Sequence, residues 1–334
     1  MNTTNDSHLA GSSVYVAGHG GLAGSAIIRR LSREDCASIK TRTHAELDLT
    51  DQKAVHRFFS EERPEYVFLA AAKVGGILAN EMYPAEFIHD NLAIQTNVIQ
   101  AAYEFNVKRL LFLGSSCIYP RDCPQPIREE YMLTGPLEAT NRPYAVAKIA
   151  GIEMCWAFNR QYGARFIAAM PTNLYGPNDS YDLENSHVLP ALLRKMHEAK
   201  EKGAAEVPVW GSGTVRREFL HADDMADACV FLMNLTDDVF DSIVSSTSQA
   251  PLLNIGCGED LTVRELAELI RDVVKFEGRL TFDTSKPDGT PRKLLDVSRM
   301  KKLGWQASIP LTRGLATVYA GGGEAFAGQV LSGT

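Results

Sequence analysis

The sequence has no long hydrophobic run and no excess of positive charge. No segment approaches the roughly 18 consecutive apolar residues that a membrane-spanning helix needs. The polar stretch from Met1 to Ser13 lacks the apolar region of a secretory signal. Acidic side chains (41) outnumber basic ones (34), so the net charge is −7. This balance argues against a general binder of nucleic acids or anionic membranes, although a local basic pocket can still hold an anionic substrate.

Paired cysteine motifs are missing as well. The six cysteines are scattered along the chain, at Cys36, Cys117, Cys123, Cys155, Cys229 and Cys257. No C-x-x-C pair is followed by a second such pair, so we expect no metal site. A chain of 334 residues, 45% of them hydrophobic, has enough apolar surface to build a core without disulfides. These features predict a cytoplasmic protein.

Apolar strand-like segments alternate with helical ones through the first two thirds of the chain. The predicted strands are Val14–Ala17, Ala37–Lys40, Tyr66–Ala70, Leu110–Leu113 and Phe166–Met170. The predicted helices are Leu22–Arg33, Asp51–Ser60, Asn91–Phe105 and Tyr144–Tyr162. Because the strands are apolar on both faces, helices must cover both sides of the sheet. This pattern predicts an α/β fold with a Rossmann-type, doubly wound parallel sheet.

The alternation loosens after Thr172. Helices are expected at Val188–Lys200 and Leu261–Val274, and loops at Trp210–Leu220 and Ser285–Lys293. We therefore predict a disordered N-terminus over residues 1–12 and an NAD(P)-binding Rossmann domain over residues 13–172. Residues 173–330 are expected to form mainly a smaller C-terminal α/β substrate-binding lobe, interleaved with the last strands of the sheet.

Three glycines, Gly18, Gly21 and Gly24, follow the first predicted strand at three-residue spacing. Glycine permits the tight turn and the close approach of backbone to a pyrophosphate, and the helix that follows presents free N–H groups to the phosphates. A strand-to-helix turn without a ligand has the same spacing, so the glycines alone are weak evidence. Their place between the first strand and the first helix favours dinucleotide binding.

The end of the second strand commonly selects the cofactor. A carboxylate there binds the ribose of NAD, whereas a cation binds the 2′-phosphate of NADP. The segment from Thr41 to His44 has no acid, and Arg42 favours NADP, with His44 able to assist when protonated. The alternative is that Arg42 is an ordinary surface charge. Asp48, followed by Leu49, is placed to bring a carboxylate near the adenine amino group.

Tyr144 and Lys148 are four positions apart, so they share one face of a helix. A cation beside a phenol is expected to lower its pKa from about 10 towards neutrality. The phenol can then pass a proton to a carbonyl oxygen as hydride arrives. Ser115 follows a buried strand at its carboxyl end, where ligands of open α/β sheets bind. A Y-x-x-x-K spacing arises by chance on helices, but the glycines and Ser115 together favour a catalytic group.

Six segments give the chain a more specific resemblance. They are Ala70–Gly76, Leu113–Pro120, Pro171–Pro177, Asn185–Val188, Arg217–His221 and Lys286–Lys293. With the glycine turn and Tyr144–Lys148, they make the sequence resemble the extended short-chain dehydrogenase/reductase family from about residue 13 to 320. Within that family it is similar to the GDP-sugar epimerase-reductases.

The resemblance implies an activity. It implies epimerisation of GDP-4-keto-6-deoxy-D-mannose at C3 and C5, followed by NADPH-dependent reduction of the C4 ketone to GDP-L-fucose. The nearest alternative is the same chemistry on a related 4-keto sugar, such as one giving GDP-colitose. A 4,6-dehydratase is less expected, because that class has an acid where this chain has Cys117. A non-catalytic NADP sensor would have no use for the reactive side chains. A homodimer is implied, through the helices near 91–105 and 144–162.

The resemblance also implies the site residues. Ser115, Tyr144 and Lys148 would be the reductase group, and Cys117 and His187 the epimerisation base and acid. The cofactor would contact Gly18, His19, Gly20, Gly21, Leu22, Ala23, Gly24, Arg42, His44, Asp48, Leu49, Ala70, Ala71, Ala72, Leu113, Gly114, Ser115, Ser116, Tyr144, Lys148, Pro171, Thr172, Asn173, Leu174 and His187. The GDP-sugar would contact Asn173, Val188, Lys195, Trp210, Arg217, Asp288 and Lys293.

Two positions depart from the family pattern. The family usually has arginine where this chain has Gly20 and again where it has His44. Both arginines normally contact the 2′-phosphate of NADP, and Arg42 can compensate for them. NADP(H) is the expected cofactor, and these two departures leave NAD as the alternative.

The two added reactive residues suit inversion at a carbon next to a ketone. A thiol has a pKa near 8.5, and a nearby cation is expected to lower the pKa of Cys117 towards thiolate formation. His187 titrates near neutrality, which suits reprotonation from the opposite face. The alternatives are that Cys117 is a small buried apolar residue and His187 a polar residue at a helix start.

Overall fold

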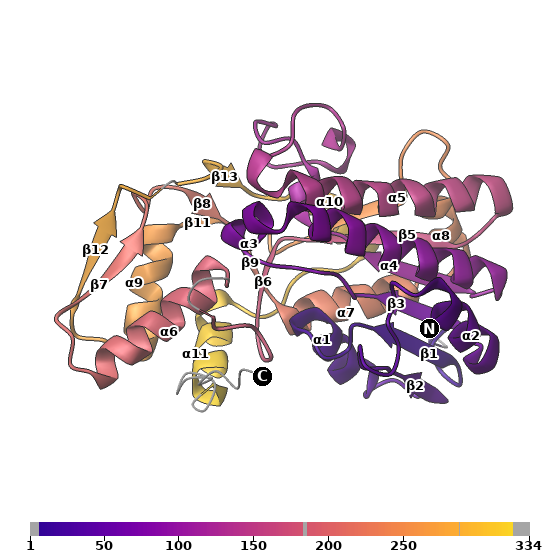
Figure 1. The fold of residues 1–334 in the computed structure, drawn as a ribbon, viewed down its shortest axis with the longest axis horizontal. Helices are drawn as coiled ribbons and strands as arrows, with labels where there is room; N and C mark the ends of the chain where they lie inside the picture. Colours follow the sequence, from indigo (N-terminus) through magenta and orange to yellow (C-terminus); the bar gives the residue numbers. More distant parts are fainter. Residues whose placement is uncertain (1–6, 183–185, 287, 323–334) are drawn as a thin grey trace.

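A six-stranded parallel sheet forms the larger part of the molecule (Figure 1). The computed structural model describes residues 7–182, 186–286 and 288–322. The strands are β1 Ser13–Ala17, β2 Ser38–Lys40, β3 Tyr66–Leu69, β4 Arg109–Leu113, β5 Phe166–Pro171 and β10 Leu252–Ile255. Their order is β10-β5-β4-β3-β1-β2, and every pair is parallel. The predicted Rossmann-type doubly wound sheet is confirmed.

Helices cover both faces of this sheet. One face carries α1 Leu22–Leu31, α7 Ala222–Met233 and α8 Asp237–Val244; the other carries α2 Gln52–Glu62, α4 Pro84–Glu104 and α5 Arg142–Tyr162. The chain leaves β1 through α1 on one face and leaves β2 through α2 on the other. The strand order therefore reverses between β1 and β3, where ligands of doubly wound sheets bind.

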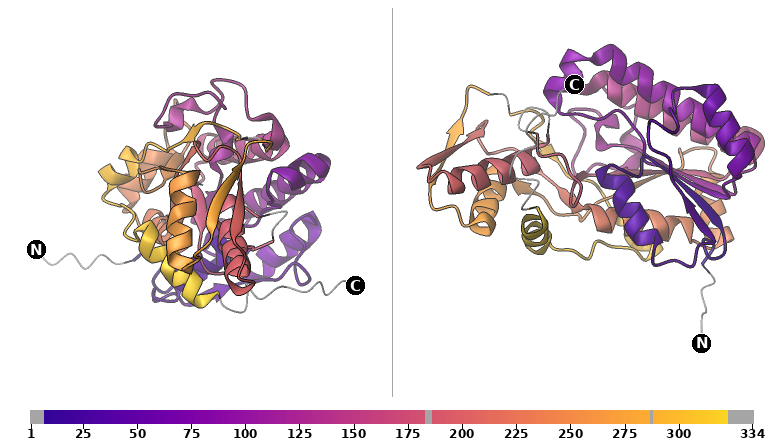
Figure 2. Two further views of the ribbon diagram at one scale, coloured as in Figure 1. Left: turned by 90° about the vertical axis from the view of Figure 1, so that its left-hand side faces the viewer. Right: turned by 60° about the horizontal axis from the view of Figure 1, so that its bottom comes forward.

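A smaller part lies at one end of the molecule, as Figure 1 and the right-hand view of Figure 2 show. Its short strands are β6 Asn173–Tyr175, β7 Glu206–Trp210, β8 Arg216–Arg217, β9 Phe219–His221, β11 Leu261–Thr262, β12 Arg279–Asp283 and β13 Arg292–Lys293. They form the sheets β11-β8-β13, β12-β7 and β6-β9. Helices α6 Val188–Glu201, α9 Val263–Val274 and α11 Leu311–Gly321 contribute to a separate apolar core.

The remaining elements are short. They are the α-helices α3 Ile77–Met82 and α10 Ser298–Leu303 and the 3-10 helices η1 Ser116–Ile118, η2 Glu129–Tyr131 and η3 Ala139–Asn141. No helix in the described ranges combines the length and apolarity that crossing a membrane requires.

Several sequence-based expectations need correction. The segment Trp210–Leu220 is not a loop, because it holds the end of β7, all of β8 and most of β9, and Ser285–Lys293 ends in β13. Strands of two or three residues are too short to leave a periodic pattern. The predicted helix from Asn91 begins earlier, at Pro84, because proline fits the first turn of a helix.

The predicted disorder of residues 1–12 is wrong for residues 7–12. Leu9 is fully buried, and the Ser7 hydroxyl donates hydrogen bonds to Glu34 (2.8 Å) and Asn234 (2.9 Å). This segment therefore packs against the start of the sheet. Residues 1–6, Asn185, Pro287 and residues 323–330, on which other expectations fell, lie outside the described residues.

Glu218 connects the two parts at the point where β8 leads into β9. Its side chain is completely buried, and its carboxylate accepts hydrogen bonds from the backbone N–H groups of Gly258 (2.7 Å) and Leu295 (2.9 Å). Its own carbonyl accepts from the side chains of Thr172 (3.2 Å) and Asn173 (2.8 Å). One residue thus fixes the ends of β5 and β10, the start of β6 and the segment after β13.

We predict that Glu218→Ala lowers the free energy of unfolding by about 3 kcal/mol, because two buried N–H groups lose their acceptors. Urea denaturation would measure this. Glu218→Gln keeps one acceptor oxygen and should fall between the wild type and the alanine variant. Glu268→Ala, at an exposed position of α9, is the control and should change stability little. An alanine variant as stable as this control would contradict the assigned role.

Candidate active site

The glycine turn is packed where it meets the sheet and open where a ligand would lie. A Cβ atom on Gly18, whose φ is +83°, would stand 2.6 Å from the Ala71 nitrogen, and one on Gly24 would stand 2.0 Å from the Gly18 carbonyl. At Gly20, by contrast, a Cβ would meet nothing within 4 Å. Larger residues are thus excluded at Gly18 by the backbone after β3 and at Gly24 by the turn itself, while the outer side of the turn at Gly20 is free.

The start of α1 fits the phosphates of a dinucleotide. Gly21 occupies the N-cap position and gives no side-chain cap, so the first N–H groups of α1 stay available for an anion. Beside it, the Nδ1 atom of His19 is buried and has no hydrogen-bond partner among the described residues. An available helix terminus and an unsatisfied polar atom next to open space are consistent with a bound pyrophosphate.

Arg42 is held in place at the end of β2. Its guanidinium donates to Glu62 (2.5 Å) and to the Thr41 carbonyl (2.7 Å), and lies over the Phe58 ring at 5.2 Å from the centroid. Lys40 pairs with the same carboxylate at 2.5 Å. Two cations therefore share one anion, which leaves a positive charge at the strand end where the 2′-phosphate of NADP binds in this kind of fold.

The other residues expected near the adenosine are more loosely held. His44 is 84% exposed, with its Nδ1 atom 4.0 Å from Asp48. Asp48 accepts hydrogen bonds from the backbone and hydroxyl of Thr50, which hold its pKa below the ordinary value. Leu49 presents its carbonyl to Asn97 (2.9 Å). His44 is therefore positioned less firmly than Arg42.

The nicotinamide end is expected at the carboxyl ends of β3, β4 and β5. Ala70, Ala71 and Ala72 follow β3, Leu113 ends β4 with Gly114 next, and Pro171 to Leu174 span the end of β5 and most of β6. A Cβ on Gly114 would stand 2.3 Å from the Met170 methyl group, so only glycine fits there without movement. These segments line one edge of the sheet, beside the glycine turn.

Tyr144, Lys148 and Ser115 come together at the start of α5. The Lys148 ammonium is buried, donates to the Leu113 carbonyl (2.9 Å) and lies 5.8 Å from the centroid of the Tyr144 ring. Ser115, in the turn after β4, lies close enough to the Tyr144 phenol and the Cys117 thiol to lower the pKa of each. The carboxyl end of β4 and the first two turns of α5 thus bring together a hydroxyl, a phenol, an ammonium and a thiol.

The expected acidification of Tyr144 is wrong for this structure. Burial raises the pKa of the phenol above its ordinary value, Cys117 raises it further, and Ser115 only partly opposes the change. Removing water disfavours the charged form of an acid. The phenol is therefore protonated at neutral pH, which is the form that donates a proton to a carbonyl oxygen.

The expected acidification of Cys117 is also wrong. The thiol is 5% exposed, and burial raises its pKa, although Ser115, Lys293 and Lys148 each act to lower it. His187 occupies the N-cap position of α6, although its side chain makes no capping hydrogen bond. Burial lowers the pKa of its imidazole, and the charge of Lys293 lowers it further. Both groups are therefore mainly uncharged at neutral pH.

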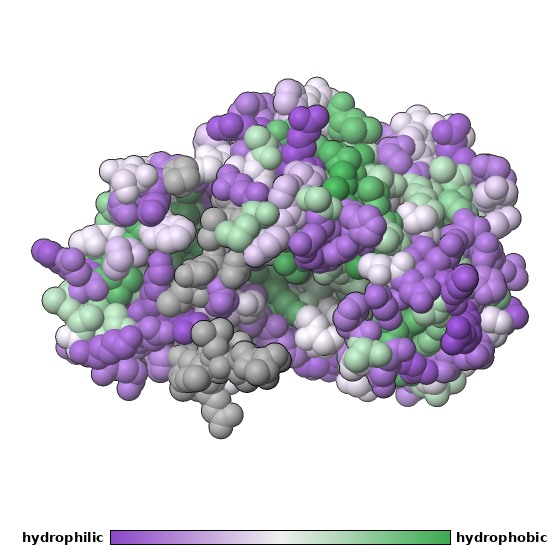
Figure 3. Space-filling model, viewed as in Figure 1, coloured by the Kyte–Doolittle hydropathy of each residue, from purple (hydrophilic) through white to green (hydrophobic). Residues whose placement is uncertain are grey.

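Several of these side chains face a recess. Tyr144 and Lys293 are half-buried and His187 is exposed, yet protein atoms surround each of them closely enough to shift its pKa. This combination is typical of groups that line a cleft. The space-filling view shows a hollow near the middle of the molecule, between the larger and smaller parts (Figure 3).

Trp210 and two lysines gather at the far end of the smaller part. The Trp210 ring is 56% exposed, with the ammonium groups of Lys195 and Lys286 at 4.8 and 5.4 Å from its centroid. An exposed aromatic face between cations suits a nucleobase next to phosphates. Lys286 was not predicted for this site, although it begins the distinctive Lys286–Lys293 segment.

Arg217 and Asp288 lie between this aromatic group and the recess. Asp288 accepts from the Ser212 backbone (2.7 Å) and acts electrostatically on Arg217, whose own pKa is lowered by burial. Arg217 stands opposite Lys293 in the pairing of β8 with β13. Two cations, Arg217 and Lys293, thus come from paired positions of neighbouring strands. Val188 and Asn173, also expected to touch substrate, begin α6 and β6.

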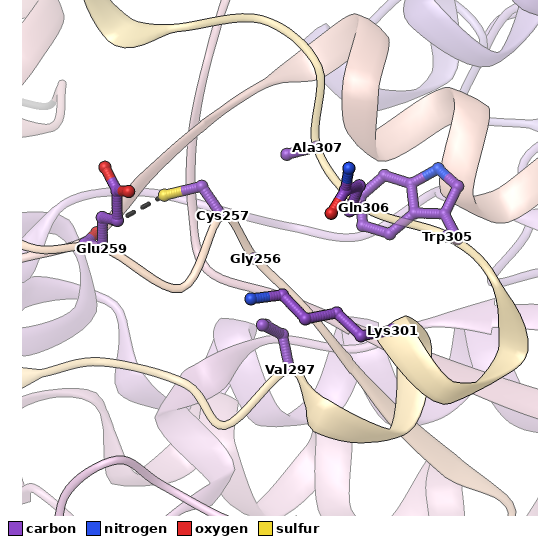
Figure 4. Close-up of a pocket in the computed structure, with 8 residues that line it drawn as sticks. All are labelled: Gly256, Cys257, Glu259, Val297, Lys301, Trp305, Gln306 and Ala307. Carbon is purple, nitrogen blue, oxygen red and sulfur yellow. Dashed lines mark hydrogen bonds between the residues drawn. The ribbon is translucent and has the colours of Figure 1, made fainter.

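A separate cavity of about 240 Å³ lies elsewhere (Figure 4). Cys257 and Glu259 line it on one side and Trp305 and Gln306 on the other, with Lys301 between them. None of its lining residues belongs to the predicted site. No group of three or more His, Cys, Asp or Glu side chains suited to a metal ion occurs within the ranges that the structure describes.

Residues 14–244 match the model of the NAD dependent epimerase/dehydratase family. The chain belongs to this family. It is 58% identical over 306 residues to GDP-L-fucose synthase 1 of Arabidopsis thaliana. The aligned residues are 92% of this chain and 91% of the Arabidopsis thaliana protein.

Two solved structures are also similar. A GDP-6-OMe-4-keto-L-xylo-heptose reductase from C. jejuni is 39% identical, with a TM-score of 0.90 over 96% of this chain and 99% of that one. A GDP-L-fucose synthetase from Naegleria fowleri bound to NADP is 26% identical, with a TM-score of 0.81 over 95% and 96%. Members of the epimerase/dehydratase family with this architecture therefore include enzymes named for several GDP-sugars.

We predict that Lys148→Met stabilises this epimerase/dehydratase family member by about 2 kcal/mol at pH 7, because it removes a buried charge. Burial lowers the pKa of Lys148 from 10.5 to about 8. Below about pH 8 the folded protein bears the cost of the buried ammonium. Between about 8 and 10.5 the folded side chain is neutral while the unfolded one is still protonated, so wild-type stability rises with pH.

Urea denaturation across this pH interval would measure the effect. The advantage of Lys148→Met should shrink as pH rises from about 8 to 10.5. Lys53→Met, at an exposed position of α2, is the matched control and should show no such dependence. A Lys148→Met variant that is less stable than wild type at pH 7 would refute this account.

Proposed function

We propose that this protein acts as a GDP-L-fucose synthase, which epimerises C3 and C5 of GDP-4-keto-6-deoxy-D-mannose and then reduces the C4 ketone with NADPH. The observation that carries the proposal is the grouping of the Cys117 thiol with Ser115 and Tyr144 beside a buried lysine. A reductase needs only Ser115, Tyr144 and the lysine. The thiol supplies a second proton-transfer group, which epimerisation requires.

NADP(H) would be held by the glycine turn, the start of α1 and the end of β2, and when bound it supplies hydride to C4. The available N–H groups of α1 and the open space at Gly20 suit its pyrophosphate. Arg42, held by Glu62 and Phe58, suits the 2′-phosphate. The NADP named with the Naegleria fowleri structure supports this choice.

In the epimerisation, the ionised fraction of Cys117 removes the proton next to the ketone, and the protonated fraction of His187 returns one to the opposite face. Both are the minor forms at neutral pH, and the transfer returns each group to its neutral form. Loss of the proton creates an enolate, whose negative oxygen needs donors. The Ser115 hydroxyl and the Tyr144 phenol, which lie close together, would provide them. The raised pKa of Tyr144 keeps its donor proton in place during this step.

In the reduction, Tyr144 gives its proton to the C4 oxygen as that oxygen becomes an alcohol. Lys148 lies beneath the phenol ring and is anchored to the Leu113 carbonyl, so its positive charge compensates the phenolate that forms. Ser115 holds the same oxygen in line.

The smaller part would hold the GDP moiety. Trp210 offers an aromatic face to guanine, while Lys195, Lys286 and Arg217 supply positive charge for the diphosphate. This assignment supports a functional division into residues 13–172, which bind the cofactor, and 173–330, which mainly bind substrate.

The decisive test is NADPH oxidation by the purified protein with GDP-4-keto-6-deoxy-D-mannose in D₂O, followed by NMR of the product. We expect NADPH to be oxidised faster than NADH, with deuterium at C3 and C5. Tyr144→Phe should lower reduction at least ~100-fold through loss of the proton donor, while deuterium still enters the sugar. Cys117→Ala should block deuterium entry.

The outcomes separate the alternatives. Deuterium at only one carbon would indicate a related 4-keto sugar, such as the precursor of GDP-colitose, as the natural substrate. No oxidation with either cofactor would refute the proposal. The 58% identity to the Arabidopsis thaliana synthase favours the fucose pathway chemistry over that alternative.

We further propose a cytoplasmic homodimer that pairs through α4 and α5. These helices pack against one another, and α5 carries the exposed apolar residues Val146 and Tyr162. The ring of Tyr162 on α5 stacks on the ring of Tyr103 on α4, with 4.4 Å between the ring centroids, so both helices contribute aromatic side chains to this face. All six cysteines are free, which suits a reducing compartment.

Sedimentation equilibrium should give twice the chain mass of 36.7 kDa. Val146→Glu should shift the protein towards monomers, because it places a charge within the pairing face. Val239→Glu, at an exposed position of α8, is the control and should leave the dimer intact. A wild-type protein that sediments as a monomer would contradict the proposal.

A further inference from the structure

We propose that Asp260 is a positioning residue for the GDP-sugar, which it serves through two cations and not by direct contact. Its carboxylate joins Arg216 of β8 to Arg292 of β13 on one face of this strand pair. The next residue of each strand, Arg217 and Lys293, is thereby held on the opposite face, where the diphosphate would bind. This inference rests on the proposed function and adds a residue behind the binding face to those that would contact the ligand.

The Asp260 carboxylate binds one arginine from each strand. Its Oδ1 atom accepts from the Nε atom of Arg216 (2.9 Å), and its Oδ2 atom accepts from the Nε atom of Arg292 (2.5 Å). The Asp260 carbonyl also accepts from the Arg216 guanidinium (2.8 Å). The carboxylate is only 5% exposed, so solvent screens these contacts less than those of a surface pair. Since Asp260 directly precedes β11, the bridge spans all three strands of the sheet β11-β8-β13.

The pairing of β8 with β13 places the second residue of each strand on the other face. In this parallel pair Arg292 stands beside Arg216, and Lys293 stands beside Arg217. Successive side chains of a strand point to opposite faces. Because the first pair turns towards Asp260, the second pair lies together on the face away from it. Strands of two residues gain little from their backbone ladder, so the side-chain bridge matters for their register.

The charges of these strands require an anion at this place. Four cations stand on two strands of two residues each, and like charges directly opposite one another repel. Glu265 lies 3.8 Å from Arg216 but is exposed, so it offsets little of this repulsion. Burial by itself would raise the pKa of the Asp260 carboxyl, but the two bound arginines bring that pKa below its ordinary value. Asp260 is therefore a buried anion at neutral pH.

The two cations on the opposite face are left for a ligand. Neither Arg217 nor Lys293 forms an ion pair with a carboxylate of the described residues, and both are half-buried. The Arg217 guanidinium donates to the Arg216 carbonyl (2.8 Å) and lies beside Gly289, where a Cβ atom would stand 3.5 Å from its Nη2 atom. Two such cations at paired positions suit a nucleotide diphosphate, whose negative groups are also adjacent.

The first test is the affinity of the full-length protein for GDP, measured by isothermal titration calorimetry. Asp260→Asn keeps the size of the side chain and removes its charge, so Arg217 and Lys293 are no longer held together. We expect the Kd for GDP to rise about tenfold, within the range of interaction energies between coupled residues. The Kd for NADPH, which would bind at the glycine turn, should stay unchanged.

Arg292→Gln is the second variant, should Asp260→Asn fail to fold. Arg292 is partly exposed, and its loss breaks the bridge from the β13 side, so the Kd for GDP should rise by a smaller factor. The matched control is Arg279→Gln, which breaks an ion pair with Glu206 (2.6 Å) across the strands β12 and β7 of the same lobe. This control should bind GDP like the wild type.

A double-mutant cycle and steady-state kinetics separate positioning from a general loss of structure. In a background with Arg217→Gln and Lys293→Gln, the effect of Asp260→Asn on GDP affinity should shrink to less than about twofold, because the carboxylate acts through these two cations. In turnover, Asp260→Asn should raise KM for GDP-4-keto-6-deoxy-D-mannose about tenfold while kcat stays within about twofold of wild type.

Several outcomes would overturn the proposal. They are a wild type without affinity for GDP, bridge variants that bind GDP like wild type, an Arg279→Gln control that weakens binding as much as they do, and independent effects in the double-mutant cycle. A fall in kcat at unchanged KM would also overturn it, since that result indicates a purely structural role. A wild type that binds GDP as expected but turns over no 4-keto sugar would refute the proposed function alone.

Discussion

The buried carboxylate of Glu218 is the interaction on which the arrangement of the two parts depends. A completely buried acidic side chain is tolerated because two backbone N–H groups, from Gly258 and Leu295, donate to it. The backbone carbonyl of Glu218 accepts hydrogen bonds from the side chains of Thr172 and Asn173. The end of β5, the start of β6, the end of the last strand of the large sheet and the segment after β13 are therefore fixed to one residue. A side chain on Gly256 would come within 2.3 Å of this carboxylate, so the chain around it is closely fitted.

Burial, more than pairwise attraction, sets the protonation states within the cleft. The phenol of Tyr144 and the thiol of Cys117 both have raised pKa values, and the ammonium of Lys148 has a lowered one. Each of these groups is thus biased towards its neutral form. Nearby lysines oppose the effect of burial at the Cys117 thiol but not at the Tyr144 phenol. The phenol therefore stays protonated as a donor, while the thiol can be deprotonated.

The sequence was sufficient for the architecture because that part depends on local patterns. Apolar strands alternating with helices, and glycines after β1, are read from neighbours along the chain. The grouping of Ser115, Tyr144 and Lys148 could also be anticipated, since the carboxyl end of β4 and the start of α5 meet in any sheet of this kind. The pKa directions could not, because they depend on how completely the folded protein excludes water from Tyr144 and Cys117. Strands β8 and β13 were missed for a related reason: two residues leave no pattern, and their pairing joins positions far apart in the sequence.

The order of elements along the chain has a consequence for biosynthesis. Strand β10 completes the large sheet beside β5, yet much of the smaller part, including α6, β7 and β8, precedes it in the chain. Strand β13, which Glu218 helps to fix, comes later still. An emerging chain therefore cannot finish the large sheet before α6, β7 and β8 have left the ribosome, and neither part is available as a continuous fragment. Helix α9 and strands β12 and β13 follow β10 in the chain, so the large sheet can close at a stage when the smaller part still lacks them.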